Sequence, residues 1–127
     1  MEQTQNVNGP YISVPDFLQK TALCPRLSRQ EELVLAAAAA NGDAAARQQL
    51  SQSYLPAVAG HIRSCSPQFQ TLALVYACLQ ALEKAMDGFD FAQDSEPFSH
   101  RLSWWLRQTT VAYIAGRREA QSQSTHL

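Results

Sequence analysis

The sequence predicts an all-α protein, a small bundle of about five helices. Apolar residues recur at spacings of three and four, and capping residues, prolines and an Asn-Gly pair separate the segments that carry this pattern. No segment of useful length alternates apolar and polar residues as a half-buried strand does. The chain has 127 residues, of which 46% are hydrophobic, so one packed domain is expected.

Two helices are expected in the first third of the chain. Pro15 suits the first turn of a short helix that Cys24-Pro25 ends. Ser28 and Glu31 then fit a capping box, in which each side chain accepts a hydrogen bond from the backbone amide of the other residue. The next helix is rich in Leu and Ala and should end at Asn41-Gly42, because glycine tolerates the left-handed turn after a helix.

The middle of the chain predicts two further helices. Asp43 suits the N-cap of the first. Its apolar stripe has a spacing of four and consists of Leu50, Tyr54, Val58 and Ile62. Pro56 should kink or restart this helix, because proline has no amide hydrogen. The second helix has the strongest amphipathic pattern, formed by Leu72, Val75, Leu79, Leu82 and Met86.

The last helix should begin near residues 97–99, after an acidic connection, and run to about Gly116. We expect a disordered tail at residues 1–10, a folded domain at 11–118 and a frayed tail at 119–127, because both ends are polar and without periodicity. Without a signal peptide or an apolar stretch of about 18 residues, a cytoplasmic protein with no membrane contact is expected.

Few motifs for chemistry are present. The sequence lacks a phosphate-binding loop, a metal-binding histidine pair and a nucleophile elbow, so we expect no enzyme activity, cofactor or small-molecule substrate. The three cysteines are widely spaced and predict no disulfide framework. His61 and Cys65 lie four residues apart but lack further metal ligands, and the acidic cluster before Pro97 lacks the spacing of a calcium loop. No metal site is expected.

Charge is unevenly distributed, although the net charge is only −1. Residues 83–96 contain five acids and one lysine, whereas residues 101–118 contain four arginines and no acid. The last helix should therefore be basic. A solvated helix face is the alternative interpretation of the same pattern.

The basic helix also carries both tryptophans of the chain. Its core stripe is expected to be Phe98, Leu102, Leu106, Thr109 and Tyr113. A different face carries Arg101, Trp104, Trp105 and Gln108. Aromatic rings suit base stacking, arginine suits phosphate and an amide suits a base edge. Packing of one or both tryptophans inside the protein is the competing interpretation.

This segment resembles the promoter-recognition helix of the sigma-70 family of bacterial transcription initiation factors. Ser99 followed by Ser103-Trp104-Trp105-Leu106-Arg107-Gln108 is similar to that helix, in which adjacent tryptophans precede an apolar residue, Arg and Gln. Four earlier segments resemble, in the same order, other parts of the family's region two and the helices before it: residues 27–33, 41–47, 54–58 and 82–90. The resemblance runs from about Tyr11 to Arg118 and includes no later domain of the family.

The resemblance implies a helical bundle that binds the clamp helices of the largest subunit of core RNA polymerase. It also implies binding to the minus-ten element of promoter DNA, preferably single-stranded. The expected DNA-binding residues are Arg101, Trp104, Trp105, Arg107 and Gln108. The expected polymerase-binding residues are Tyr76, Leu79 and Glu83.

Several positions depart from the family's pattern. Arg101 stands where the family has an aromatic residue that captures a flipped adenine, and residues 73–79 lack the acidic and amide side chains of the docking helix. These departures favour a second interpretation, a degenerate sigma-like module that acts only through protein contacts, as a decoy or regulator. A third, an unrelated helical adaptor, requires the ordered match to arise by chance.

Overall fold

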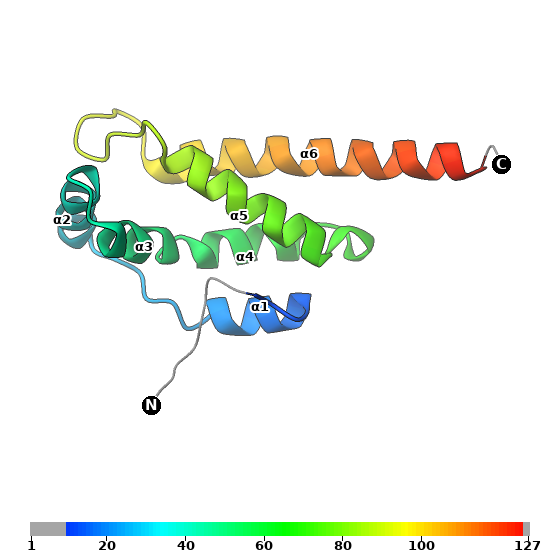
Figure 1. Cartoon of the computed structure of the whole chain (residues 1–127), viewed down its shortest axis with the longest axis horizontal. Coiled ribbons are helices and arrows are strands. Elements are labelled where there is room, and N and C mark those ends of the chain that lie inside the picture. The colour runs from blue at the N-terminus through cyan, green and yellow to red at the C-terminus, as the bar shows by residue number, and fades with distance from the viewer. Residues whose placement is uncertain (1–9, 126–127) are drawn as a thin grey trace.

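The computed structural model describes residues 10–125, and within this range the chain is all-helical, as the sequence predicts. Six α-helices and one short 3₁₀ turn form the bundle (Figure 1). They are α1 Val14–Thr21, α2 Arg29–Ala40, α3 Ala44–Gln52, α4 Leu55–Ser64, η1 Pro67–Phe69, α5 Leu72–Met86 and α6 Phe98–Thr125. Residues 1–9 and 126–127, which belong to the two expected tails, lie outside the described residues.

The expected capping interactions are present in the first half of the chain. The Ser28 hydroxyl accepts a hydrogen bond of 3.1 Å from the Glu31 amide, and the Glu31 carboxylate accepts one of 2.8 Å from the Ser28 amide. Asp43 caps α3 by accepting from the Ala46 amide at 3.1 Å. Gly42 has a φ of 96°, the left-handed conformation that ends α2. These local predictions are confirmed.

Pro56 restarts the helix, one of the two expected outcomes: α3 ends at Gln52 and α4 begins at Leu55, which makes six helices of the described chain where about five were expected. The expected end of the last helix near Gly116 is wrong, because α6 continues through Thr125 and includes residues 119–125 of the expected frayed tail. The Arg, Glu, Ala and Gln residues in this stretch favour helix, which explains why one glycine does not end it.

The core lies where α1, α4, α5 and α6 meet. Figure 1 shows α5 crossing between α6 and α4, with α1 on the far side of α4 and the α2–α3 hairpin at one end. The largest fully buried side chains include Phe17, Ile62, Leu74, Leu82 and Leu102. The stripes predicted for α5 and α6 face this core, with Leu82 and Leu102 each 1% exposed.

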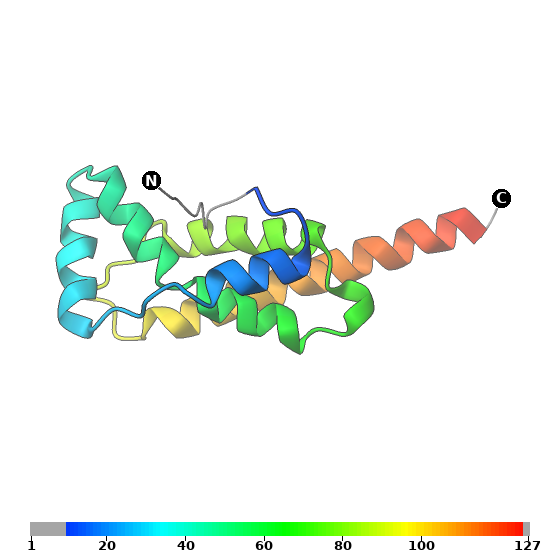
Figure 2. The same ribbon diagram turned by 90° about the horizontal axis from the view of Figure 1, so that it is seen from below.

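The C-terminal turns of α6 project beyond the rest of the bundle, as both ribbon views show (Figures 1 and 2). Only the first part of this helix therefore packs along α5. Within residues 10–125, no helix combines the length and the apolar content needed to cross a membrane.

Candidate nucleic-acid interface

The two tryptophans occupy different environments on α6. Trp104 is 50% exposed, whereas Trp105 is half-buried against the core. Their ring centroids are 5.5 Å apart, and the rings are nearly perpendicular at 87°. The interpretation that a tryptophan packs inside the protein therefore fits Trp105. Trp104 has an exposed ring face, and the ring of Trp105 packs against it edge-on.

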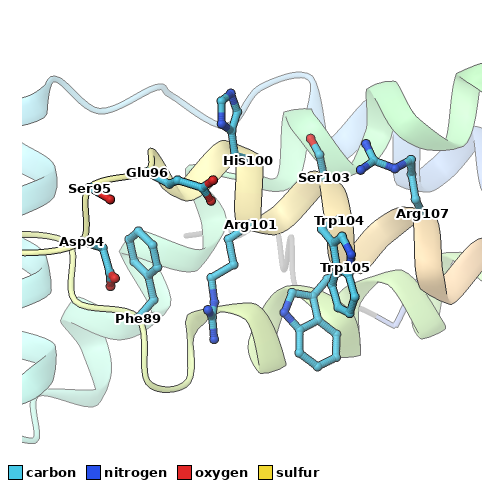
Figure 3. A pocket seen from close by; sticks show the side chains of 10 residues that line it. All are labelled: Phe89, Asp94, Ser95, Glu96, His100, Arg101, Ser103, Trp104, Trp105 and Arg107. Atoms are coloured by element: carbon cyan, nitrogen blue, oxygen red, sulfur yellow. The ribbon is translucent and has the colours of Figure 1, made fainter.

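A groove of about 860 Å³ runs between α6 and the connection from α5 to α6 (Figure 3). We call it the tryptophan groove. Its lining residues are Phe89, Asp94, Ser95, Glu96, His100, Arg101, Ser103, Trp104, Trp105 and Arg107. Four of the five expected DNA-binding residues thus share one surface feature. Gln108, the fifth, is exposed but does not line the groove.

Arg101 lines the groove, and its guanidinium is bonded to the end of α5. Its Nε donates to the carbonyl oxygen of Ala85 at 2.6 Å, and its Nη2 donates to the carbonyl oxygen of Asp87 at 3.2 Å. Its guanidinium carbon also lies 5.8 Å from the ring centroid of Phe89. The carbonyls at a helix C-terminus lack partners within the helix and carry partial negative charge, so this cation stabilises the end of α5.

The connection before α6 contributes acidic side chains to the tryptophan groove. In Figure 3, Asp94 and Ser95 lie on this loop, and Glu96 lies beside His100 at the start of the helix. The Asp94 carboxylate accepts a hydrogen bond of 2.7 Å from the amide of Asp90, which closes the connection into a tight loop. The two carboxylates offset the charges of Arg101 and Arg107, so the groove has little net charge to attract phosphate.

Arg107 lies on a ridge between the tryptophan groove and a second groove. The second groove, of about 430 Å³, runs between α4 and α6. We call it the hydroxyl groove, and its lining residues are Ala57, His61, Ser64, Ser99, Leu102, Ser103, Leu106 and Arg107. Ser103 and Arg107 line both grooves.

The three expected polymerase-binding residues also come together. Tyr76, Leu79 and Glu83 line a groove of about 540 Å³ between α3 and α5, which we call the α3–α5 groove. Tyr76 is 37% exposed, and its hydroxyl accepts a hydrogen bond of 2.6 Å from the Tyr11 amide. The Glu83 carboxylate lies 3.0 Å from Arg47 Nη2 and accepts a bond of 2.8 Å from the Ser51 hydroxyl. Two of the three side chains are thus already engaged within the protein.

Sequence reasoning missed the residues that hold these surfaces in place. Arg47 pairs with Glu83 and Asp87 across α3 and α5, and the Nε2 of His61 lies 2.6 Å from the hydroxyl of Thr110 across α4 and α6. The partners are separated by 36 to 49 residues. No local pattern in the sequence marks such pairs.

Among the residues that the structure describes, no group of three or more His, Cys, Asp or Glu side chains is placed to hold a metal. The thiol of Cys78 is buried, which raises its pKa to about 12, so it stays protonated at neutral pH and is a poor nucleophile. The grooves therefore offer stacking, hydrogen bonding and charge.

No model of a known protein family matches the chain.

Proposed function

We propose that this chain is a sigma-70-like region-two domain that engages core RNA polymerase and promoter minus-ten DNA during transcription initiation. It would act in the cytoplasm and catalyse no reaction of its own. The observation that best supports the proposal is the half-exposed ring of Trp104, held by Trp105 in the segment that resembles the family's promoter-recognition helix.

Base stacking is the role proposed for Trp104. A base of an unpaired strand can lie against its open face, which is worth on the order of 1–3 kcal/mol per base. The perpendicular ring of Trp105 limits the positions that Trp104 can adopt, so less side-chain freedom is lost on binding. Bases inside an intact duplex hide their faces, and single-stranded or forked DNA should therefore be preferred.

The α3–α5 groove is the surface proposed for polymerase. Tyr76 and Leu79 contribute apolar area, and Arg47 and Glu83 form a charged edge. Helix-in-groove docking uses this combination of an apolar strip and a polar rim. A partner helix, such as a clamp helix of the largest subunit, would contact this chain through more apolar surface than the family's polar docking motif offers.

The second candidate function is a sigma-like module that acts only through protein contacts. Two observations favour it. Arg101 is hydrogen-bonded to carbonyl oxygens at the end of α5, and the carboxylates of Asp94 and Glu96 line the tryptophan groove. Arg101 stands where the family has the aromatic residue that captures a flipped adenine, so the groove lacks a ring at that position. Such a module would occupy polymerase without opening DNA, as a decoy or regulator.

Fluorescence anisotropy with forked and duplex minus-ten oligonucleotides separates the two functions. We expect the parent protein to bind forked DNA more tightly than duplex DNA. Trp104→Ala should lower the affinity for forked DNA by about ten-fold or more, because one stacked base is worth on the order of 1–3 kcal/mol and about 1.4 kcal/mol corresponds to ten-fold in Kd. Val111→Ala is the matched control, because Val111 is an exposed apolar residue of α6 that lines neither groove. Equal binding by the two variants would contradict stacking. Binding of core polymerase without any DNA binding would favour the second function.

A further inference from the structure

Two grooves of different chemical character lie on either side of one ridge of α6. The ridge consists of Ser103 and Arg107, which line both grooves. In Figure 3 these two side chains project from one side of the helix, and the rings of Trp104 and Trp105 lie on the other. One groove therefore presents aromatic surface, and the other begins at a serine and an arginine.

The hydroxyl groove carries no acidic residue among those that line it. Its polar groups are the hydroxyls of Ser64, Ser99 and Ser103, the imidazole of His61 and the guanidinium of Arg107. Arg107 is exposed and forms no ion pair with any residue that the structure describes. The tryptophan groove differs, because Asp94 and Glu96 form part of its wall and Arg101 is bonded to α5.

The walls of the hydroxyl groove are held in a fixed arrangement. Thr110 donates to the carbonyl oxygen of Leu106 at 2.9 Å, so its oxygen accepts the 2.6 Å hydrogen bond from His61 Nε2. This bond joins α4 to α6 beside the groove. The apolar residues that line the groove are Ala57, which is exposed, and Leu102 and Leu106, which are buried.

We propose that a nucleic-acid strand crosses α6 at the ridge of Ser103 and Arg107, with its bases in the tryptophan groove and its phosphates in the hydroxyl groove. This rests on the proposed function, in which α6 binds DNA. Arginine and serine side chains are common phosphate ligands in protein–DNA complexes. Phosphates placed in the tryptophan groove would meet the Asp94 and Glu96 carboxylates and be repelled.

A carboxylate placed on the ridge tests where the phosphates run. We expect Ser103→Asp to weaken binding of a forked minus-ten oligonucleotide by about ten-fold or more in low salt, because its charge would face the phosphates. Ala115→Asp is the control: it adds the same charge at an exposed position of α6 that lines neither groove. Serine and alanine are both exposed at these positions, so neither substitution disturbs the core.

Neutral methylphosphonate linkages, placed one at a time along the strand, identify the phosphate that Arg107 contacts. Arg107→Ala should flatten the dependence of log Kd on log salt by about one unit of slope. At one or two linkages, the neutral substitution should weaken binding by the parent protein but have no further effect on Arg107→Ala.

The outcomes separate this inference from the function on which it rests. The phosphate path is wrong if Ser103→Asp and Ala115→Asp weaken binding equally and no linkage is coupled to Arg107. If Trp104→Ala still loses binding in that case, the proposal that α6 binds DNA stands. If the parent protein binds neither forked nor single-stranded DNA in low salt, both the path and the DNA-binding function are wrong.

Discussion

The Nε of Arg101 in α6 donates a hydrogen bond of 2.6 Å to the carbonyl oxygen of Ala85 in the last turn of α5. A second bond, of 3.2 Å, joins Nη2 to the carbonyl oxygen of Asp87. One side chain thus caps one helix and attaches it to the next, just where the connection turns back along the bundle. The resemblance implies a DNA-facing role at this position, whereas the structure gives the guanidinium partners inside the protein.

Arg101→Tyr should therefore destabilise the protein, even though it introduces the aromatic residue that the sigma-70 family has at the corresponding position. The substitution removes both hydrogen bonds and leaves two carbonyls to water, which should lower the free energy of unfolding by about 1–3 kcal/mol. Urea denaturation followed by circular dichroism measures this change. Arg118→Tyr, at an exposed position of the same helix, should keep the parent's midpoint. A midpoint for Arg101→Tyr equal to that of the parent would show that the cap contributes nothing.

Local sequence patterns were sufficient for much of the fold. The capping box of Ser28 and Glu31 and the glycine stop at Gly42 depend on residues that are neighbours in the chain, so the sequence alone predicts them. The bond from Arg101 to Ala85 spans 16 residues and depends on how α6 crosses α5. The different burial of Trp104 and Trp105 depends on the same crossing, because helical spacing alone places both rings on one face.

Leu82 provides the test of the strongest amphipathic stripe. Its side chain is 1% exposed at the centre of the core. Leu82→Ala should cost about 2–5 kcal/mol of stability, from lost burial and the cavity left behind. The denaturation midpoint measures this loss. Leu23→Ala, at a leucine that is 69% exposed, should change the midpoint little by comparison.

Replacement of Tyr11 by phenylalanine should stabilise the protein. Its hydroxyl is buried, and no hydrogen-bond partner for it is found among the described residues. Tyr11→Phe removes a polar group that has lost water without a replacement, so stability at pH 7 should rise by up to about 1–3 kcal/mol. Tyr113→Phe is the control with the opposite expected sign. The Tyr113 hydroxyl forms a hydrogen bond of 2.6 Å with the Thr71 hydroxyl, so its removal should lower the stability.

The same tyrosine affects unfolding at alkaline pH. Burial raises the pKa of Tyr11 from 10.0 to about 12, so the folded protein favours the neutral phenol. The resulting stability is fully present below pH 10 and is lost as pH rises toward 12. Tyr11→Phe should therefore lose less stability than the parent between these pH values. Parallel curves of stability against pH would contradict the assignment of this effect to Tyr11.

His61 should make the protein less stable in mild acid. Burial, and secondarily the positive charge of Arg107, lower the pKa of His61 below its ordinary 6.5. The unfolded chain then binds a proton more readily, so stability falls as pH drops from about 6.5 through the lower folded-state pKa. Thermal unfolding from pH 7.5 to 5 measures the decline. His61→Gln should reduce it.

Polymerase docking is tested most cleanly at Gln80, which lines the α3–α5 groove and is exposed. Gln80→Arg places a long cationic side chain beside the apolar surface of Leu79 without disturbing the core. The charge should interfere with apolar packing between this surface and a partner helix. We expect capture of core polymerase to weaken at least ten-fold. Gln93→Arg adds the same charge at an exposed position that lines none of the three grooves described above, and it should bind as the parent does. If both variants capture polymerase equally well, the partner binds elsewhere on the bundle. If the parent captures none, polymerase is not the partner of this groove.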